Sequence, residues 1–261
     1  MRTLLMAGLV LLHGTLAMAA EPLEEHPLSI EKRAMLTASF QDRIDRTTKL
    51  IAAEPDVVEH YSSRGDARFF LARFDEAVAD YEQMVKLKPE LATSHWRRGI
   101  AYFYANRPKD AAHQFEIYHT FDDVDRENGI WRFFSQVRAT GIEKAREGLL
   151  KYRKDDREPF PAVYRLFEGK TKPAEILDGI RQAEITKDQR EMRLFYAQLY
   201  IGLNDAVEDK PEEARAHLKE AVANTWGPVA GYGPAYMWHV GRVHYDLLRQ
   251  KVEQDAKNRE K

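Results

Sequence analysis

The sequence has 261 residues, of which 44% are hydrophobic, 31% are charged and none is cysteine. A chain of this length can bury a sizeable core, and its formal net charge of -2 at pH 7 does not suit a nucleic-acid partner. The absence of cysteine excludes disulfides, thiolate metal sites and a cysteine nucleophile.

The first residues have the pattern of a secretory signal peptide. Arg2 supplies a positive charge, residues 4–12 form a short apolar run, and the small residues 17–20 include an Ala-x-Ala step. The run is too short to span a bilayer comfortably, so we expect cleavage after Ala19. The mature protein is then expected to be periplasmic or secreted, soluble, and free of a lipid anchor because it lacks the cysteine that would carry one. An uncleaved N-terminal anchor is the alternative.

The segment after the signal peptide is predicted to be an extended leader over residues 20–28, because it is rich in proline and glutamate. Ser29 is a candidate N-cap, and a helical pattern of apolar residues follows it as far as Pro55. This helix has no full repeat signature. We expect it to occupy the second-helix place of a degenerate leading repeat and to cap the stack.

Five pairs of residues then recur at one offset of 34 residues, which is the period of the tetratricopeptide repeat, or TPR. The pairs are Gly65 and Gly99, Ala77 and Ala111, Tyr81 and Phe115, Pro55 and Pro89, and Arg64 and Arg98. In such a repeat the glycine lies where helix A is crossed closely by helix B. The spacing predicts an all-α solenoid of helical hairpins with regular repeats at about 58–90 and 92–121. The two arginines are expected to pair with acidic neighbours between helices.

A less regular middle section follows the two repeats. We expect a helix that ends near Thr140, a partner helix over 142–152, a short helix that ends at Gly169, and another over 172–183 opened by Pro173. Two regular repeats are fewer than a stable stack needs. These additional helices therefore have to pack onto the stack.

A late repeat is predicted at about 192–224, but its register is ambiguous. Gly202 lies twelve residues before Ala214, as Gly65 does before Ala77, yet residues 203–209 have the composition of a loop. We therefore align Gln198 with the glycine position and accept a longer turn. The glycines and prolines of 227–234 break the chain before a capping helix that ends near 248. We thus predict a single helical domain over 29–248, followed by a charged tail at 249–261.

No segment carries a complete catalytic or metal-binding motif. His113 and His119, and His239 and His244, are six and five residues apart, whereas two ligands on one helix face need a spacing of three or four. The run Asp123-x-Asp125-x-Glu127 resembles the opening of a calcium loop, but its glycine comes one place late and the twelfth position is phenylalanine. We expect no metal, no cofactor and no enzyme activity.

The concave face of the two regular repeats is the predicted binding groove, because helix A residues that face away from helix B line it. The positions are Glu59, Asp66, Phe69, Thr93, Trp96, Ile100, Phe103 and Tyr104. They form an aromatic floor with an acidic edge, which would anchor an extended peptide or a helix. The alternative is that the N-terminal helix or a second subunit fills this groove.

From His95 onward the chain contains the rest of the two regular repeats, then an irregular middle section, and then a late repeat. The stretches are HWRRGIAYFYANRPKDAA, QFEIYHTF, NGIWRFF, IEKAREGLLKYRKDD, FPAVYRLFEG, FYAQLYIGL and ARAHLKEAVANT. This succession, within 61–226, resembles the NlpI-type TPR proteins, which are bacterial envelope lipoproteins. The family's lipid-bearing cysteine is missing here, and the Gly- and Pro-rich segment at 227–234 is a second difference.

The NlpI-type resemblance implies a homodimeric periplasmic scaffold that brings a C-terminal-processing protease or peptidoglycan hydrolases to their substrates. The leading hypothesis is therefore a non-catalytic scaffold or adaptor that binds other envelope or secreted proteins, with no nucleic acid and no membrane span. The alternative is a carbohydrate- or muropeptide-binding module that uses exposed tryptophans, namely Trp96, Trp131, Trp226 and Trp238. A hydrolase is the third and weakest hypothesis.

Overall fold

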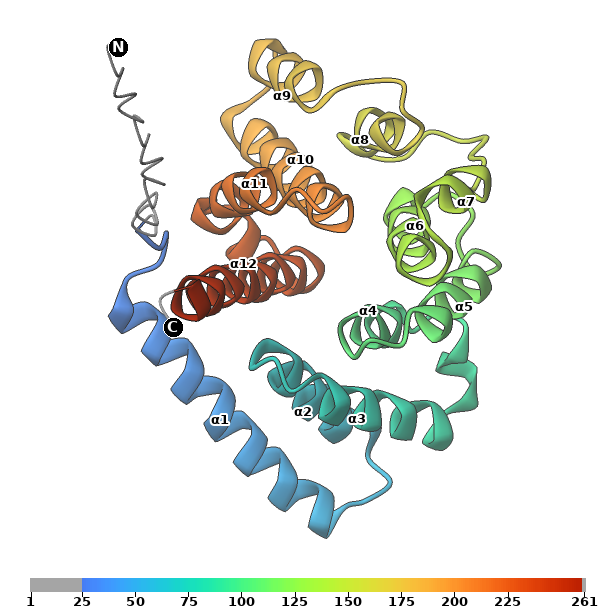
Figure 1. Ribbon diagram of the computed structural model, residues 1–261. Helices are drawn as coiled ribbons and strands as arrows, with labels where there is room; N and C mark the ends of the chain where they lie inside the picture. The colour runs from blue at the N-terminus through green and yellow to red at the C-terminus, as the bar shows by residue number, and fades with distance from the viewer. Residues whose placement is uncertain (1–24, 260–261) are drawn as a thin grey trace, which may run out of the picture.

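The computed structural model describes residues 25–259, and this part of the chain folds into twelve α-helices and two 3-10 helices without a strand (Figure 1). The predicted all-α class is thus confirmed. The signal peptide predicted at 1–19 lies outside the described residues. Within residues 25–259, no helix combines the length and apolar character needed to cross a membrane.

The helices pack mainly on their neighbours in the chain, as successive hairpins do in a helical repeat. In chain order they are α1 (Ile30–Ala53), α2 (Val58–Phe70), α3 (Phe74–Leu87), η1 (Pro89–Ala92), α4 (Trp96–Tyr104), α5 (Pro108–Tyr118), α6 (Arg126–Thr140), α7 (Ile142–Glu147), α8 (Phe160–Phe167), α9 (Pro173–Gln182), α10 (Lys187–Val207), α11 (Pro211–Ala223), η2 (Gly227–Val229) and α12 (Tyr232–Arg259). The predicted N-cap of α1 is confirmed, because the Ser29 hydroxyl accepts the Lys32 amide at 3.2 Å.

The glycine pairs of the 34-residue pattern mark two equivalent helix crossings. A Cβ atom at Gly65 would lie 2.7 Å from the ring of Tyr81, and one at Gly99 would lie 2.6 Å from the ring of Phe115. Only glycine therefore allows these helices to approach each other so closely. The spacing found in the sequence corresponds to a repeated contact.

The arginines that precede these glycines also make equivalent bonds. Arg64 forms an ion pair with Asp80 at 2.7 Å, as expected, on the neighbouring helix. In the second hairpin Arg98 donates instead to the side-chain amide oxygen of Gln114 at 2.7 Å, so the prediction of an acidic partner is wrong there. Both bonds join the two helices of a hairpin.

The late hairpin has the same register as the two regular ones, which corrects the alignment at Gln198. Helix α10 continues through residues 203–207, where a loop was expected, and a Cβ at Gly202 would lie 2.8 Å from Leu218 and 3.1 Å from the Ala214 carbonyl oxygen. Gly202 is therefore the equivalent of Gly65. The late repeat needs no longer turn.

The turns of the three hairpins explain why this register is hard to see in the sequence. Ala72, Asn106 and Asp209 each follow their hairpin's glycine by seven positions, and each has a left-handed backbone with φ between 56° and 60°. The next residue donates its amide to a carbonyl five residues back in all three hairpins. This helix-ending geometry is most common at glycine, and none of the three positions is glycine.

The middle section departs from the prediction in one helix. Helix α7 ends at Glu147 and does not reach residue 152. The segment that follows is held in a different direction, because the Tyr152 hydroxyl donates to the Asp125 carbonyl oxygen at 3.0 Å and the Leu150 carbonyl accepts the Tyr164 hydroxyl at 2.8 Å. At the end of α8, Gly169 has a φ of +70° just beyond the helix, where the sequence predicted its end.

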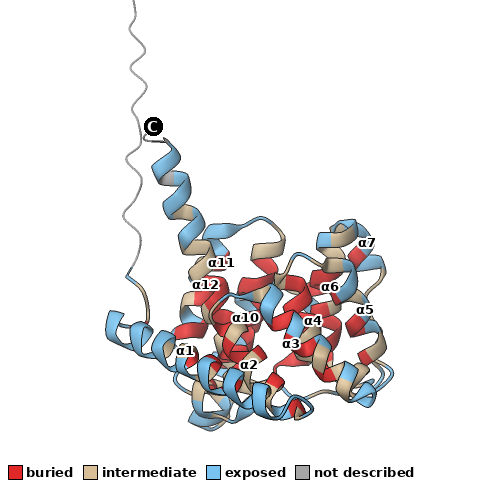
Figure 2. Cartoon of the chain, turned by 90° about the horizontal axis from the view of Figure 1, so that it is seen from below, coloured by how far each residue is buried: buried red, intermediate tan, exposed pale blue. Residues whose placement is uncertain are grey.

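The chain of hairpins curves so that its last helices return to the first ones (Figure 1). Helix α12 packs against α11 and also reaches α2. The expected charged tail after 248 is a continuation of α12, whose exposed end projects away from the body (Figure 2). Buried residues gather on the faces that the helices turn towards each other.

The C-terminal helix fills the groove that was predicted inside the first repeat. Tyr236 of α12 is 1% exposed, and its ring lies 5.5 Å from Phe69, 5.1 Å from Phe70 and 4.9 Å from Trp96. Beside the first repeat the groove is thus covered by α12, and not by the N-terminal helix that was one of the alternatives. These contacts are buried and aromatic, and they close the curved array.

A buried polar network accompanies the aromatic contacts between α12 and the first hairpins. The carboxylate of Asp66 accepts hydrogen bonds from Tyr81 at 2.7 Å, from Arg97 at 2.6 Å and from Tyr232 at 2.6 Å. Arg97 also donates to Ser62 at 3.0 Å. Because the charge of Asp66 is paired and hydrogen-bonded, its burial is tolerated.

Truncation of Tyr236 tests the closure of the array by α12. We expect Tyr236→Ala to lower the free energy of unfolding by about 3–5 kcal/mol, because it empties a fully buried site, and Tyr236→Phe to lower it by about 1 kcal/mol. Urea unfolding followed by circular dichroism gives both values. A loss below about 1 kcal/mol for the alanine variant would contradict the closure.

Substitution of Gly202 tests the register of the late hairpin. We expect Gly202→Ala to destabilise the protein by about 1–3 kcal/mol, because the new methyl group meets the backbone of α11. The control is Gly179→Ala in α9, where a Cβ meets no atom within 4 Å. Since alanine is the better helix former, that variant should gain about 0.5–1 kcal/mol. Equal effects of the two changes in denaturant unfolding would refute the register.

Candidate functional site

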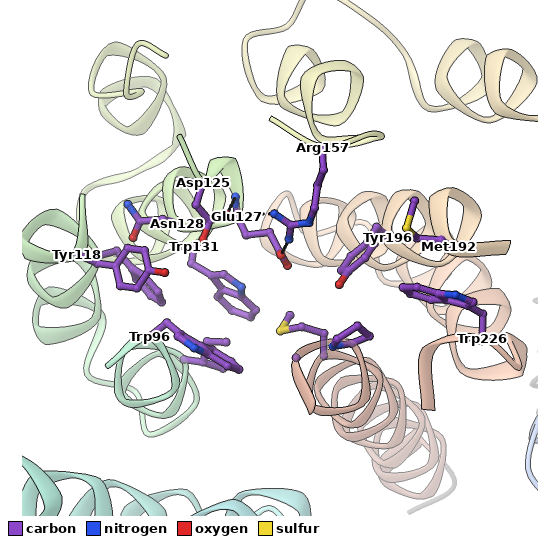
Figure 3. A pocket seen from close by; sticks show the side chains of 15 residues that line it. Trp96, Tyr118, Asp125, Glu127, Asn128, Trp131, Arg157, Met192, Tyr196 and Trp226 are labelled. Carbon is purple, nitrogen blue, oxygen red and sulfur yellow. Dashed lines mark hydrogen bonds and ion pairs between the residues drawn. The ribbon is translucent and has the colours of Figure 1, made fainter. Parts of the chain in front are cut away.

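A pocket of about 400 Å³ remains inside the curved array, between helices α4 to α6 on one side and α10 to α12 on the other (Figure 3). Most of its wall is apolar or aromatic, and these residues are Trp96, Ile100, Phe115, Tyr118, Trp131, Met192, Tyr196, Trp226, Pro234 and Met237. One corner is polar and is formed by Asp125, Glu127, Asn128 and Arg157. The combination of an apolar wall with a few polar groups is typical of a ligand site.

The polar corner is built where two helices begin. Asp125 is the N-cap of α6 and accepts the amide of Glu127 at 3.0 Å. Arg157 precedes α8, and its guanidinium lies 4.3 Å from the centre of the Phe160 ring. Glu127 accepts hydrogen bonds from Arg157 and from the hydroxyl of Tyr200. The corner therefore joins three segments that are far apart in the sequence.

The environment of this corner disfavours negative charge. Burial raises the pKa of Asp125 to about 7, and the neighbouring carboxylate of Glu127 adds to the shift. Burial likewise raises the pKa of Glu127, although Arg157 and Tyr200 oppose that effect. Asp125, with its pKa of about 7, is therefore only partly ionised near neutral pH.

Two residues of the wall hold polar atoms that have no hydrogen-bond partner among residues 25–259. Trp131 is 2% exposed and its Nε1 is unpartnered, and Asn128 is 3% exposed with both amide atoms unpartnered. The indole of Trp131 points into the pocket (Figure 3). Since an unpartnered buried polar group costs about 1–3 kcal/mol, a ligand that bonds to these atoms would regain part of that energy.

Two of the eight residues predicted for the groove, Trp96 and Ile100, line this pocket. Three others contact α12 or are covered by it. Asp66 binds Tyr232, Phe69 stacks on Tyr236, and the hydroxyl of Tyr104 lies 2.9 Å from His244.

The remaining three predicted residues lie away from the pocket. Phe103 is 1% exposed and lies 3.7 Å below the guanidinium of Arg138. Glu59 is an exposed residue that pairs with Lys88 at 3.7 Å, and Thr93 is exposed after η1. The prediction thus found one wall of the pocket, and the part of the groove beside the first repeat is not open.

The carbohydrate hypothesis assumed that the tryptophans are exposed. None of the four is exposed, but three of them line the pocket. Trp131 is buried, and Trp96 and Trp226 are partly buried. Trp238 is 2% exposed and donates its Nε1 to the Val222 carbonyl at 3.0 Å, so it has a packing role. The three pocket tryptophans come from separate parts of the chain.

Sequence reasoning missed the polar corner. Asp125 and Glu127 were noticed only as a failed calcium loop, and Asn128 and Arg157 were not singled out. The one local signal was the suitability of aspartate as an N-cap before α6.

Within the described part of the chain, no cluster of three or more histidine, aspartate or glutamate side chains is arranged to hold a metal ion.

Neutralising Asp125 tests the electrostatics of this corner. A carboxyl whose folded-state pKa is raised binds its proton preferentially in the folded state, so stability falls as pH rises from about 4 to about 7. Asparagine cannot ionise but still caps a helix. We therefore expect Asp125→Asn to stabilise the protein by about 1 kcal/mol at pH 8 and by less at pH 5 in urea unfolding.

The matched control for this prediction is Asp123→Asn. Asp123 is exposed and pairs with the equally exposed Lys154 at 3.0 Å, so its neutralisation should give no comparable gain. A stabilisation by Asp125→Asn that is the same at both pH values would contradict the raised pKa. Glu127, Asp156 and Arg157 face Asp125 in both proteins, so their own titration is common to the comparison.

No protein-family model matches the sequence, and no curated protein matches it either. The chemistry of the pocket has to be interpreted from the residues that form it.

Proposed function

We propose that the protein is a non-catalytic TPR-type scaffold or adaptor that holds a segment of another exported protein in its interior pocket. The observation that carries this proposal is the aromatic pocket itself, with the unpartnered polar atoms of Trp131 and Asn128 in its wall. A site of about 400 Å³ has the size for a few residues of a peptide, not for a folded domain.

The TPR assignment is supported by contacts that recur with the 34-residue period. Gly65 and Gly99 face equivalent rings, and Gly202 faces the equivalent position of the late hairpin. Arrays of such hairpins commonly bind peptides on their inner face. Here α12 covers part of that face, so binding is confined to the space that it leaves open.

The absence of catalysis is part of the proposal and is supported by the state of the two pocket carboxylates. Asp125 is engaged as a helix cap, and Glu127 accepts hydrogen bonds from Arg157 and Tyr200. Both carboxyl groups therefore have a structural role that does not require a reaction. Burial is the largest cause of the raised pKa of each carboxyl, and a like charge adds to it, from Glu127 in the case of Asp125 and from Asp156 in the case of Glu127.

The proposed location is the periplasm or the exterior of the cell, on the basis of the signal-peptide pattern at 1–19. The NlpI-type resemblance points to a C-terminal-processing protease or a cell-wall hydrolase as the class of partner. The same resemblance suggests a homodimer.

Carbohydrate binding is a second candidate, favoured by a specific observation. Trp96, Trp131 and Trp226 line one pocket beside planar polar side chains, and aromatic faces stack well on the apolar faces of sugars. A neutral glycan could also accept the unpartnered Nε1–H of Trp131.

A pocket-filling substitution tests the proposed function. Gly233 lines the pocket, and a Cβ there meets no atom within 4 Å, so the side chain of Gly233→Phe can start from this position without a clash at its Cβ. The immobilised protein first captures proteins from an envelope extract, and these are identified. Segments of the captured proteins are then synthesised as peptides, and their binding to the protein is measured by titration with tryptophan fluorescence. We expect Gly233→Phe to weaken segment binding at least tenfold, or about 1.4 kcal/mol.

The control is Gly179→Phe, which places the same side chain at an equally open position in α9, outside the pocket. It should leave the dissociation constant of the segment within about twofold. Binding that survives Gly233→Phe would show that the pocket is not the site. Saturable binding of oligosaccharides without any protein segment would favour the second candidate.

A further inference from the structure

We propose that the ligand group taken by the interior pocket is the ammonium of an amino-acid residue, which lies against the Asp125 and Glu127 carboxylates. This inference rests on the proposed function and names the chemistry that the bound segment must carry. Two independent features lead to it, namely the charge balance of the polar corner and the aromatic wall around it.

The polar corner holds more negative than positive charge. Asp125, Glu127 and Asp156 all face the single guanidinium of Arg157, with Asp125 at 3.8 Å and Asp156 at 3.3 Å. The guanidinium of Arg126, the residue before Glu127, lies 5.0 Å from the centre of the Tyr152 ring and does not line the pocket. Three carboxylates thus share one cation.

The exposure of these groups makes the imbalance larger on the pocket side. The side chain of Arg157 is 47% exposed, whereas those of Asp125, Glu127 and Asp156 are only 21%, 16% and 6% exposed. Water can solvate the arginine but not the carboxylates to the same degree. A cation brought by a ligand would be attracted strongly at such a site, and an anion would find Arg157 already paired.

The aromatic wall suits the same ligand. The faces of tryptophan and tyrosine carry partial negative charge and attract ammonium groups within about 6 Å. Trp96, Trp131 and Tyr196 surround the space in front of Glu127 (Figure 3). The methylene stem of the ligand would contact Met192 and Met237, whose flexible side chains adapt to an irregular shape.

The unpartnered atoms indicate that the ammonium belongs to an amino-acid residue. Trp131 offers a buried N–H donor that needs an acceptor, which an ammonium cannot be but an amide carbonyl can. The Asn128 side chain offers a carbonyl oxygen as well as an NH₂ group. A lysine side chain or a chain's N-terminal amine, each with a nearby carbonyl, satisfies both residues.

The proposal makes the binding depend on pH. Burial and the charge of Glu127 raise the pKa of Asp125 to about 7, so this carboxyl loses its proton between pH 6 and 8. A lysine ammonium stays protonated in this range, whereas an α-ammonium, with an ordinary pKa of about 7.7–8.0, loses its proton near the upper end. The affinity for a lysine-type ligand should therefore rise as pH increases from 5.5 to 8. That for an α-amine should rise only up to about pH 7, and that for an uncharged ligand should not rise.

The test is a titration of the full chain, followed by tryptophan fluorescence, with three small amides. They are Nα-acetyl-lysine N-methylamide, its uncharged counterpart Nα-acetyl-norleucine N-methylamide, and leucine N-methylamide, whose only ammonium is the α-amine. We expect one of the two ammonium ligands to bind at least tenfold more tightly than the norleucine ligand at pH 8. The preferred one identifies the source of the ammonium as a side chain or a chain terminus.

Asp125→Asn should reduce this preference at least fivefold and remove its rise with pH. The variant keeps a helix-capping side chain, and circular dichroism verifies its fold. The control Asp123→Asn changes an exposed carboxyl of the same loop, so the preference should stay within twofold of the unsubstituted protein.

Equal binding of all three amides would overturn the ammonium proposal and leave the peptide pocket intact, provided that Gly233→Phe still weakens segment binding at least tenfold. Tighter binding of a neutral oligosaccharide than of any amide would overturn both and support the carbohydrate candidate. If none of the three amides binds while Gly233→Phe still weakens the binding of partner segments, only the ammonium proposal is overturned.

Discussion

The packing of α12 against the inner face of the first hairpins is the contact on which the rest of the structure depends. A curved array of helical hairpins leaves an apolar inner face that must be covered. Tyr236 provides this cover by inserting between Phe69, Phe70 and Trp96. The last helix thereby joins the first hairpins, and the array becomes closed and not an open solenoid.

The pocket is a consequence of this closure. Helix α12 covers the inner face beside the first hairpin, but it leaves a space opposite α4 to α6 (Figure 3). Its wall therefore combines Trp96 and Trp131 from the first half of the chain with Tyr196 and Trp226 from the second. These aromatic side chains would otherwise be part of the core, but here they face a space that is large enough for a ligand.

Two buried carboxylate sites show the difference between a structural and a binding arrangement. Asp66 accepts three hydrogen bonds, one of them from Arg97, and so its charge is fully matched inside the protein. Asp125 and Glu127 share Arg157 with Asp156, and beside them Trp131 holds an unpartnered donor. The first arrangement is complete within the protein, whereas the second leaves an unpartnered donor beside unequally paired charges.

The sequence by itself determined the helices, the 34-residue spacing and the hairpin contacts at Gly65 and Gly99, because these depend on residues close together in the chain. It misplaced the register at Gly202, since Asp209 takes a left-handed turn that usually marks glycine.

Only the tertiary structure decided which part of the inner face stays open. The position of α12 depends on long-range contacts such as that of Tyr236 with Phe69, 167 positions earlier in the chain, and no local pattern encodes them. The same reason hid the polar corner, because Glu127, Arg157 and Tyr200 acquire their roles only when three separate segments meet. Local periodicity thus specified the repeat, and the closure of the array specified the site.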